Sequence, residues 1–216
     1  MIRCDGWSEP VVLMPPQYLE DPTMVLGVDG FTLYYSRGPS LQDQRVYCRY
    51  SESPIGPIAS REARIHPYFE THTRIERARV SADLWLHTAS WPGPPTGGIM
   101  AFARQLWGGV TRSLVLTIQP GTGWSFIAAN PCVEVDAFGP GEHAIIFEGC
   151  VDRSCDWHLY LARWRVGQMA TVEGELFRGA NPSLLLHEGR RYLYYSALTS
   201  AGYSAGFETR VVSQPA

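Results

Sequence analysis

The amino-acid sequence predicts an all-β protein, a small β-propeller of four or five blades whose last blade is completed by the N-terminal strand. Three observations predict this fold class. One phrase of sequence occurs twice, polar residues before proline recur at blade-sized intervals, and short β-type runs alternate with turn residues. Helical periodicity is weak along the whole chain.

The repeated phrase is the most specific of these observations. Residues 20–37 read EDPTMVLGVDGFTLYYSR, and residues 180–197 read ANPSLLLHEGRRYLYYSA. Both place a polar residue before proline, followed by an apolar run, a glycine-containing turn and Leu-Tyr-Tyr-Ser. Ser36 follows Asp21 by 15 residues, and Ser196 follows Asn181 by the same 15. Equal spacing without a gap indicates that one structural unit is built twice.

Polar residues before proline divide the chain into four such units. The four pairs are Asp21-Pro22, His66-Pro67, Asn130-Pro131 and Asn181-Pro182. They stand 45, 64 and 51 residues apart, and the step from Asn181 through the C-terminus back to Asp21 is 56. Steps of this size suit the four-stranded blades of a propeller, in which radial repetition protects the sheet edges.

Short apolar and aromatic runs bounded by turn residues predict the strands of each unit. The first unit has runs at residues 23–28, 31–36 and 45–50, and the second at 66–72, 83–89 and 98–104. The third has runs at 132–136, 143–149 and 157–164, and the fourth at 183–187, 191–197 and 207–212. Residues 6–13, GWSEPVVL, form a further strand that we expect to complete the last blade.

Other arrangements of these strands stay open. A degenerate fifth blade within residues 66–130 is one alternative to the four-bladed ring. A β-sandwich or an irregular barrel is the other. In each case 216 residues suit a single domain spanning residues 1–216.

The bulk composition excludes several classes of function. The net charge of −3 gives no reason to expect a nucleic-acid partner. All 18 residues of the Lys and Arg class are arginine, which excludes Schiff-base lysine chemistry. The sequence shows neither an apolar signal core nor the roughly 20 apolar residues needed to span a bilayer, so we expect a cytoplasmic protein with no membrane partner. Five cysteines without a secretion signal predict no disulfide framework.

The blade-opening motifs EDPTMVLGVDGFTLYYS and ANPSLLLHEGRRYLYYSA resemble those of the five-bladed propeller glycosidases, the group that contains glycoside hydrolase families 43, 32 and 68. The stretch NPCVEVDAFGPGEHAIIFEG, from residue 130, resembles them less well. In that group an Asp at the start of an innermost strand acts as base or nucleophile, a second Asp tunes it, and a Glu is the acid. By motif Asp21 matches the first role. The corresponding positions of the other units hold His66, Asn130 and Asn181, so the resemblance assigns neither the second Asp nor the acid.

Hairpin geometry predicts which side chains lie near these opening residues. The end of the second strand of an antiparallel hairpin returns beside the start of the first. Aligning LYYS with LYYS, IIFE and LWLH gives four return residues, namely Ser36, His87, Glu148 and Ser196. Together with the four opening residues they are expected to form a polar ring around the propeller axis, with Asp21 and Glu148 as a carboxylate pair flanked by His66 and His87.

Such a ring suits acid–base chemistry, because glycosidic hydrolysis needs one ionised and one protonated carboxyl group. A histidine beside a carboxylate also serves proton transfer near neutral pH. An architectural role is the alternative, since Asp or Asn before proline favours an extended start of the strand and a turn bond to the backbone. Asn130, Asn181, Ser36 and Ser196 are the candidate substrate-binding residues of the ring.

The segment HPYFETH carries a second cluster of candidate residues. Period-two alternation puts His66, Tyr68, Glu70 and His72 on one face of a strand. Glu70 is therefore an alternative to Glu148 as the acid. We expect no metal there. Cys150, Cys155 and His158 resemble half of a zinc site but lack a second cysteine pair, so loop or buried thiols are expected instead.

Aromatic residues offer candidate sugar-stacking surfaces. Tyr34-Tyr35 and Tyr194-Tyr195 are adjacent pairs, so only one member of each can face a ligand while the blade core takes the other. Trp91 and Trp107, in a Pro- and Gly-rich stretch, are better candidates for substrate stacking, with ordinary packing as the alternative. The sequence contains neither a phosphate-binding glycine loop nor a nucleophile elbow, and we expect no cofactor.

Three functions therefore stay open. The first is an enzyme with acid–base residues in the axial funnel, acting on a small oxygen-rich substrate, for which the resemblance implies glycoside hydrolysis. The second is a non-hydrolytic cyclase, lyase or isomerase of small-molecule biosynthesis on the same fold, needing only one acid–base residue. The third is a noncatalytic sugar- or ligand-binding propeller. All three take a small molecule as partner, and the sequence makes no prediction of oligomeric state.

Overall fold

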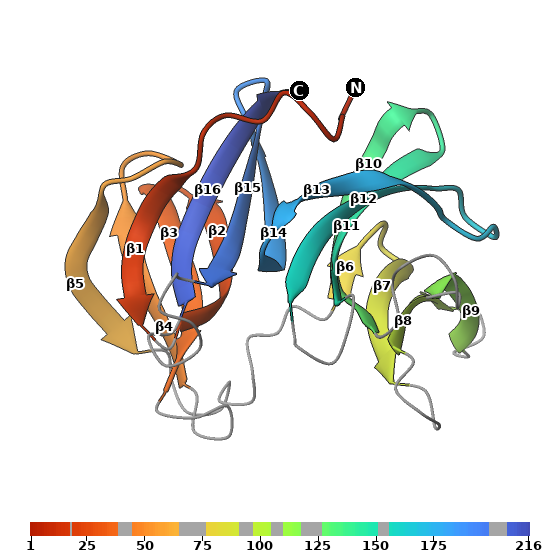
Figure 1. Ribbon diagram of the computed structural model, residues 1–216, viewed down its shortest axis with the longest axis horizontal. Coiled ribbons are helices and arrows are strands. Elements are labelled where there is room, and N and C mark those ends of the chain that lie inside the picture. The colour runs from red at the N-terminus through yellow and green to blue at the C-terminus, as the bar shows by residue number, and fades with distance from the viewer. Residues whose placement is uncertain are drawn as a thin grey trace. The chain divides into compact units, whose positions relative to one another are not determined.

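The computed structural model of the protein describes residues 1–17, 19–38, 45–64, 77–90, 97–104, 110–117, 127–150, 156–198 and 207–216. Strands are the only regular elements in these ranges, and they form four antiparallel sheets of four strands each (Figure 1). The all-β prediction is confirmed. No helix in the described ranges has the length and apolar character needed to cross a bilayer.

Three of the sheets are meanders in which strands that follow one another in the chain lie side by side. The first contains β2 (Leu19–Gly27), β3 (Gly30–Arg37), β4 (Arg45–Ser51) and β5 (Ile58–Arg64). The second contains β6 (Arg77–Arg79), β7 (Leu84–Ser90), β8 (Gly97–Arg104) and β9 (Val110–Thr117). The third contains β10 (Ile127–Gly139), β11 (Glu142–Cys150), β12 (Trp157–Trp164) and β13 (Thr171–Arg178).

The fourth sheet joins the two ends of the chain. Its strands are β14 (Ala180–His187), β15 (Arg190–Leu198), β16 (Phe207–Pro215) and, beside β16, β1 (Val11–Gln17). The red β1 beside the blue β16 is visible in Figure 1. This confirms that an N-terminal strand completes the last sheet, but the strand begins at Val11 and not at residue 6. Pro10 has no N–H to donate, and before it Ser8 bonds to Ser213 of β16 through its backbone N–H and its hydroxyl.

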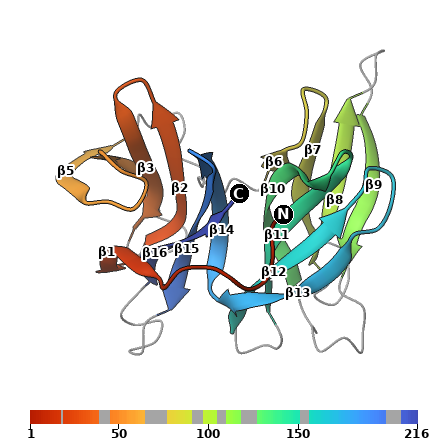
Figure 2. The ribbon, with the colours of Figure 1, turned by 90° about the horizontal axis from the view of Figure 1, so that it is seen from above.

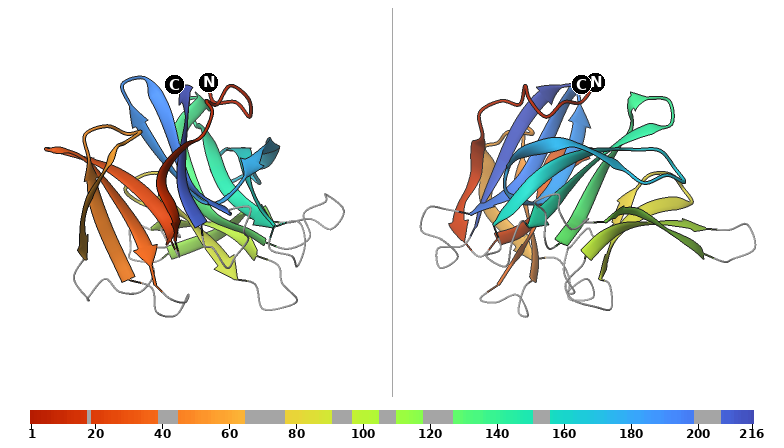
Figure 3. Two further views of the ribbon diagram at one scale, coloured as in Figure 1. Left: turned by 60° about the vertical axis from the view of Figure 1, so that its left-hand side comes forward. Right: turned by 45° about the vertical axis from the view of Figure 1, so that its right-hand side comes forward.

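The strands that complete the first three sheets, β5, β9 and β13, were not among the sequence predictions. Figure 3 shows β5 at the outer edge of its sheet, as its pairing with β4 alone requires. The second sheet also begins differently from the prediction. The run at residues 66–72 lies outside the described residues, and the described strand that pairs with β7 is β6, whose Arg77 lies opposite His87.

The chain divides into two compact units, each with two sheets. One unit comprises Met1–Asp5 and Ile75–Ala180, and the other Gly6–Arg74 and Asn181–Ala216. The single domain expected from chain length stays a prediction.

The unit of residues 6–74 and 181–216 has its core between sheet β2–β5 and the sheet that contains β1 and β14–β16. Phe31, Leu33 and Tyr35 point from one face of β3 toward Tyr192 and Tyr194 of β15, with Met14, Met24 and Val211 completing the cluster. Burying each of these large side chains contributes roughly 1.5–3 kcal/mol relative to exposure. Of the two tyrosine pairs, Tyr35 and Tyr194 fill this core, and the Tyr194 hydroxyl donates to the Pro54 carbonyl at 2.7 Å.

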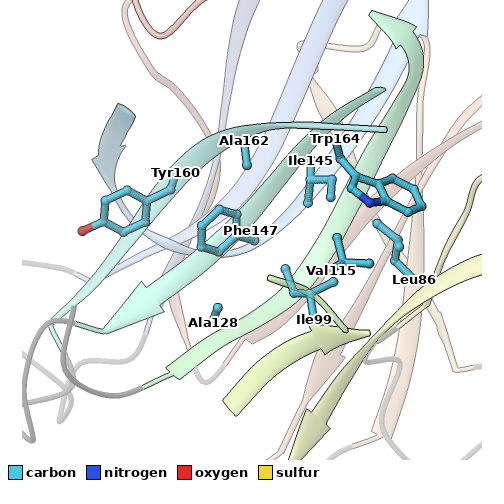
Figure 4. Packing of buried hydrophobic residues seen from close by; sticks show 9 residues of the cluster. All are labelled: Leu86, Ile99, Val115, Ala128, Ile145, Phe147, Tyr160, Ala162 and Trp164. Atoms are coloured by element: carbon cyan, nitrogen blue, oxygen red, sulfur yellow. The ribbon is translucent and has the colours of Figure 1, made fainter. Parts of the chain in front are cut away.

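The unit of residues 1–5 and 75–180 is held together by a similar core. Leu86, Ile99 and Val115 of sheet β6–β9 meet Ala128, Ile145, Phe147, Tyr160, Ala162 and Trp164 of sheet β10–β13 (Figure 4). Figure 2 shows these two sheets side by side. Trp164 is almost fully buried and donates its indole N–H to the carbonyl of Gln168 at 3.0 Å, which satisfies its one polar atom.

Candidate active site

Three of the four opening residues lie at the same backbone feature, a residue with positive φ immediately before proline. The φ angles are 55° at Asp21, 47° at Asn130 and 53° at Asn181. At the first two the strand pairing shifts by one residue, between Glu20 and Thr23 and between Ala129 and Cys132, which marks a β-bulge. The expected extended start of the strand is therefore wrong at these positions.

The bulge explains why the repeated letter is Asp or Asn. Most residues avoid positive φ because Cβ approaches the following carbonyl oxygen, whereas Asp and Asn tolerate it through local side-chain hydrogen bonds. The bulge also re-aims the side chain that it carries. The architectural and the chemical interpretations of these residues are thus compatible, since the conformation selects Asp or Asn and leaves open which of the two occurs.

Asp21 lies next to its predicted return residue, Ser36. The Ser36 hydroxyl donates to Oδ2 of Asp21 at 3.4 Å, and both residues are buried, with Asp21 only 6% exposed. A carboxylate taken out of water is costly unless it is hydrogen-bonded, paired or used in chemistry. The β2–β3 hairpin therefore holds a shielded carboxylate at a fixed bulge.

Asn181 repeats this arrangement in the same unit without the charge. Its Nδ2 lies 3.5 Å from the Ser196 Oγ, and Ser196 is buried as Ser36 is. The Asn side chain is only half-buried. The two hairpins differ in their chemistry because a carboxylate accepts hydrogen bonds only, whereas an amide both donates and accepts.

The third hairpin places its carboxylate on the opposite strand. Asn130 Nδ2 donates to Oε1 of Glu148 at 2.8 Å, and both side chains are buried, Glu148 being 5% exposed. The strand pairing puts Ala129 opposite Glu148. The side chain that contacts Glu148 is that of Asn130, the opening residue beside which the sequence alignment put it. Glu148 is thus a second shielded carboxylate, with an amide donor in place of a hydroxyl.

The side chains of the other candidate residues are not among those that the structure describes. His87 lies within β7, and its side chain is not among those described. His66, Glu70, Trp91 and Trp107 all lie outside the described residues, as does Cys155. Their expected roles stay predictions.

His158, which the sequence grouped with Cys150 and Cys155, lies beside two carboxylates. Its Nδ1 lies 2.6 Å from Glu175 and its Nε2 lies 3.5 Å from Asp156, so both ring nitrogens face carboxylates. Burial, and then the charges of Glu175 and Asp156, raise the pKa of neighbouring Tyr160 to about 12. Among the described residues, Cys4, Cys48, Cys132 and Cys150 are not in disulfides, and no group of His, Cys, Asp and Glu is arranged to hold a metal ion.

Sequence reasoning missed a polar cluster around Glu62 on β5. Glu62 accepts a hydrogen bond from the Tyr35 hydroxyl. Two arginines, Arg37 of β3 and Arg49 of β4, form ion pairs with the same carboxylate at 3.1 and 3.2 Å. Burial and the bond to Glu62 raise the pKa of Tyr35. The signal was available in the alternation of Arg45, Tyr47 and Arg49, which puts all three side chains on one face of a strand.

Comparison with known proteins defines the fold. No protein-family model and no curated protein matches the chain in sequence. Among solved structures, one of the glycoside hydrolases described within the GH130 family of mannoside phosphorylases has a TM-score of 0.54 at 10% identity, over 93% of this chain and 85% of its own. An α-L-arabinofuranosidase from Lactobacillus brevis has a TM-score of 0.50 at 10% identity, over 90% and 71% respectively.

The class of protein is thereby settled at the level of fold. The chain has a fold like that of these glycoside hydrolases, from which its sequence has diverged. The predicted resemblance to the propeller glycosidases is confirmed as a likeness of fold. Fold alone does not determine activity, so the chemistry must be argued from the hairpins.

Proposed function

We propose that the protein is a glycoside-cleaving enzyme in which Asp21 is the base or nucleophile and Glu148 the acid. Glu70 is the alternative acid, and His66 or His87 adjusts the protonation of the carboxylates. Asn130, Asn181, Ser36 and Ser196 bind substrate hydroxyls, and Trp91 and Trp107 stack on sugar rings. The substrate is a small carbohydrate, and the reaction proceeds without a cofactor.

The observation that carries this proposal is the buried carboxylate of Asp21. Asn181 has the same positive φ before proline and an equivalent serine partner, Ser196, in the same unit. An amide therefore meets every architectural demand of the position at no cost in buried charge. Retaining a carboxylate there costs free energy, which is typical of groups kept for chemistry.

The two carboxylates suit the two roles that glycoside cleavage requires. An acid protonates the leaving oxygen as the glycosidic bond breaks, while a carboxylate attacks the anomeric carbon or removes a proton from the attacking water. Asp21 receives a hydroxyl donor, which favours its ionised form. The amide of Asn130 donates to Oε1 of Glu148 and so orients this carboxyl group.

Asp21→Asn and Glu148→Gln test the proposal directly. A panel of 4-nitrophenyl glycosides, including α-L-arabinofuranosides and β-mannosides, is first used to find a substrate. Each substitution is then expected to lower turnover by about 10²–10⁴-fold, the usual contribution of a positioned acid or base. Melting temperature serves as the folding control, and Asp29→Asn, at an exposed turn residue of the same hairpin, as the matched variant, which is expected to keep activity. Undiminished turnover in both Asp21→Asn and Glu148→Gln rejects the assignment.

Two alternatives remain distinguishable by the same assays. The presence of Asp at only one of the three described positive-φ positions before proline favours an enzyme with one acid–base residue, such as a cyclase, lyase or isomerase. In that case all glycosides stay intact, while a metabolite is converted in an Asp21-dependent reaction. Ligand stabilisation without any product would favour a noncatalytic binding protein, in which the Asn130 and Asn181 amides serve as hydrogen-bonding groups.

A further inference from the structure

The first residues of the chain are divided between the two units. Met1–Asp5 belong to the unit that contains residues 75–180, whereas Gly6–Arg74 belong to the other unit. Gly6 lies at this division with a φ of 79°, a left-handed conformation that glycine adopts without strain. We call Met1–Asp5 the N-terminal arm. The arm packs in one unit and continues directly into the other.

The N-terminal arm is anchored by an apolar side chain. Ile2 is 2% exposed, although its neighbours Met1 and Arg3 are open to solvent. The arm belongs to no strand, so the backbone pairing of a sheet does not hold it in place. Burial of a large aliphatic side chain favours the docked position because it removes apolar surface from water. Ile2 therefore fixes the arm in its unit.

Strand β13 provides a seat for Cys4 of the arm. A Cβ added at Gly174 would lie 3.1 Å from the Sγ of Cys4, which is closer than such contacts normally come. Glycine within a strand often marks a place where another segment approaches closely. Burial, and then the charges of Glu173 and Asp5, raise the pKa of the Cys4 thiol, so the group that packs there is the neutral thiol. The missing side chain of Gly174 thus makes room for the arm.

The seat lies on the second apolar face of sheet β10–β13. Gly174 is opposite Leu161, and Leu161 is opposite Ile146, so these three residues share a face. It is the face opposite to that of Ile145 and Ala162, which belong to the core shared with sheet β6–β9. Leu161 and Ile146 are both almost fully buried. Cys4 therefore packs on a face whose apolar residues are shielded from water.

The chain is anchored again soon after the arm, in the other unit. The backbone N–H of Ser8 donates to the Ser213 carbonyl at 2.8 Å, and the Ser8 hydroxyl accepts from the Ser213 N–H at 3.0 Å. Ser8 follows Cys4 by four residues, a stretch that spans at most about 14 Å. The two anchors are therefore joined by a short tether.

A second short connection joins the units where β13 ends at Arg178 and β14 begins at Ala180. A body attached at one point can turn about three axes. A body attached at two points can turn only about the line that joins them. The third passage of the chain, in residues 65–76, lies outside the described residues. A docked arm therefore restricts the relative motion of the units more than the β13–β14 connection does by itself.

We propose that the N-terminal arm is a clasp that couples the two units, with Ile2 and the contact of Cys4 with Gly174 as its attachment. Asp21 and Glu148 belong to different units. Under the proposed function, on which this second step rests, the arm is therefore a positioning element for the two carboxyl groups. It acts on the reaction only through the units that it joins.

Scanning calorimetry of the whole chain tests the coupling. The unmodified protein is expected to unfold in one transition. Ile2→Asp is expected to unfold in two, because a carboxylate does not stay buried without a partner and the arm undocks. Val28→Asp makes the same change of charge at a fully exposed residue and is expected to keep one transition.

Ile145→Ala is the control for stability, since it truncates a core residue within one unit. It is expected to lower the melting temperature by at least about 4 °C and to keep one transition. Two transitions in the unmodified protein, or one in Ile2→Asp, overturn the inference. Two transitions in Ile145→Ala also overturn it, because loss of stability alone would then separate the units.

The contact of Cys4 with Gly174 supplies a second test that adds no charge. Gly174→Ala puts a methyl group 3.1 Å from Sγ and is expected to lower the melting temperature by about 2–6 °C. In the Cys4→Ala background the nearest atom is Cβ at 3.9 Å, an ordinary contact, so the same change is expected to cost less than about 1 °C. An equal cost in both backgrounds shows that the arm has no seat at Gly174 and overturns the inference.

Turnover separates the failure of this inference from that of the proposed function. Once a glycoside substrate is found, Ile2→Asp is expected to lower kcat about 10–100-fold while both units are folded, because small displacements of catalytic groups have effects of that size. Val28→Asp is expected to keep kcat. Two transitions with an unchanged kcat reject the positioning role. If the unmodified protein cleaves no glycoside, the proposed function fails, and calorimetry still decides whether the arm couples the units.

Discussion

The β2–β3 and β14–β15 hairpins are the same structure with different chemistry. Both open on a positive-φ residue before proline, at 55° for Asp21 and 53° for Asn181, and both return a buried serine 15 residues later. They differ at the positive-φ residue, which carries a carboxylate in one hairpin and an amide in the other. The repeat is therefore set by backbone and core, and the residue that varies within it is where function is to be sought.

The β10–β11 hairpin extends this comparison to the other unit. It keeps the bulge at Asn130 but returns Glu148 in place of serine. A hairpin of this kind can thus carry its carboxylate on either strand. Each hairpin places an opening residue beside a return residue. The charge is on the opening residue in β2–β3 and on the return residue in β10–β11.

The largest expected effect tests whether the two matching hairpins share their architecture. Leu33 and Leu193 occupy equivalent positions, and both are fully buried. Leu33→Ala and Leu193→Ala are each expected to lower the free energy of unfolding by about 2–5 kcal/mol through lost burial and a residual cavity. Urea unfolding measures both.

Val28→Ala is the control, because Val28 is fully exposed in the β2–β3 turn and its truncation should change stability by less than about 0.5 kcal/mol. A small effect of Leu193→Ala beside a large one of Leu33→Ala would contradict the equivalence of the hairpins.

Much of this architecture could be predicted from sequence, because it depends on local patterns. Alternation and turn residues locate the strands, and equal spacing aligns the repeats. β5 was missed because its sequence, IASREAR, has charged residues on both faces and lies at a sheet edge where little of it is buried. The start of β1 was placed too early, because the prediction included Pro10, which has no N–H for strand pairing, and the residues before it.

The second prediction concerns a negative charge added at the positive-φ asparagines. Asn130→Asp places a carboxylate within about 3 Å of Glu148, in the position of an amide that now donates at 2.8 Å. We expect a loss of about 1–3 kcal/mol in stability at pH 7, because two buried carboxylates repel and a hydrogen bond is lost. Asn181→Asp should cost less than about 1 kcal/mol, since Ser196 can donate to it as Ser36 does to Asp21.

The pH dependence provides the check on this explanation. Repulsion raises the pKa of one carboxyl of the new pair above its unfolded value, so the penalty is present at pH 7 and shrinks as the pH falls toward 4 and that group binds a proton. Urea unfolding of Asn130→Asp at both pH values measures the change. A penalty independent of pH would show that shape, and not charge, is the cause.

The candidate site was predictable in part for the same reason. Ser36, Glu148 and Ser196 were placed beside Asp21, Asn130 and Asn181 by counting along hairpins. The bulge was not predicted, because residues before proline usually avoid this conformation and only the strand pairing reveals it. The Glu62 cluster joins three strands, and contacts of that kind cannot be read from any one run of sequence.

The third prediction concerns the backbone alone. Asp21→Ala and Asn181→Ala must keep a positive φ that alanine disfavours, at a cost of roughly 1–2 kcal/mol each. Asp21→Gly and Asn181→Gly should recover most of this loss, because glycine has no Cβ to clash. Melting curves of the four variants measure it. A stable alanine variant with an unstable glycine variant would show that the side-chain hydrogen bond, and not the backbone angle, selects Asp and Asn.

The smallest effects distinguish the two serines. At 3.4 Å the hydroxyl of Ser36 makes a weak hydrogen bond to Asp21, so Ser36→Ala should lower turnover only about threefold. Removing a donor from an ionised carboxylate disfavours that form, so the acidic limb of the pH–rate profile should move to higher pH. Ser196→Ala should leave the acidic limb of the profile in place, because Asn181 carries no charge to stabilise. An unshifted profile in Ser36→Ala would assign Ser36 to the scaffold, and a loss as large as that of Asp21→Asn would mean that the hydroxyl itself takes part in the reaction.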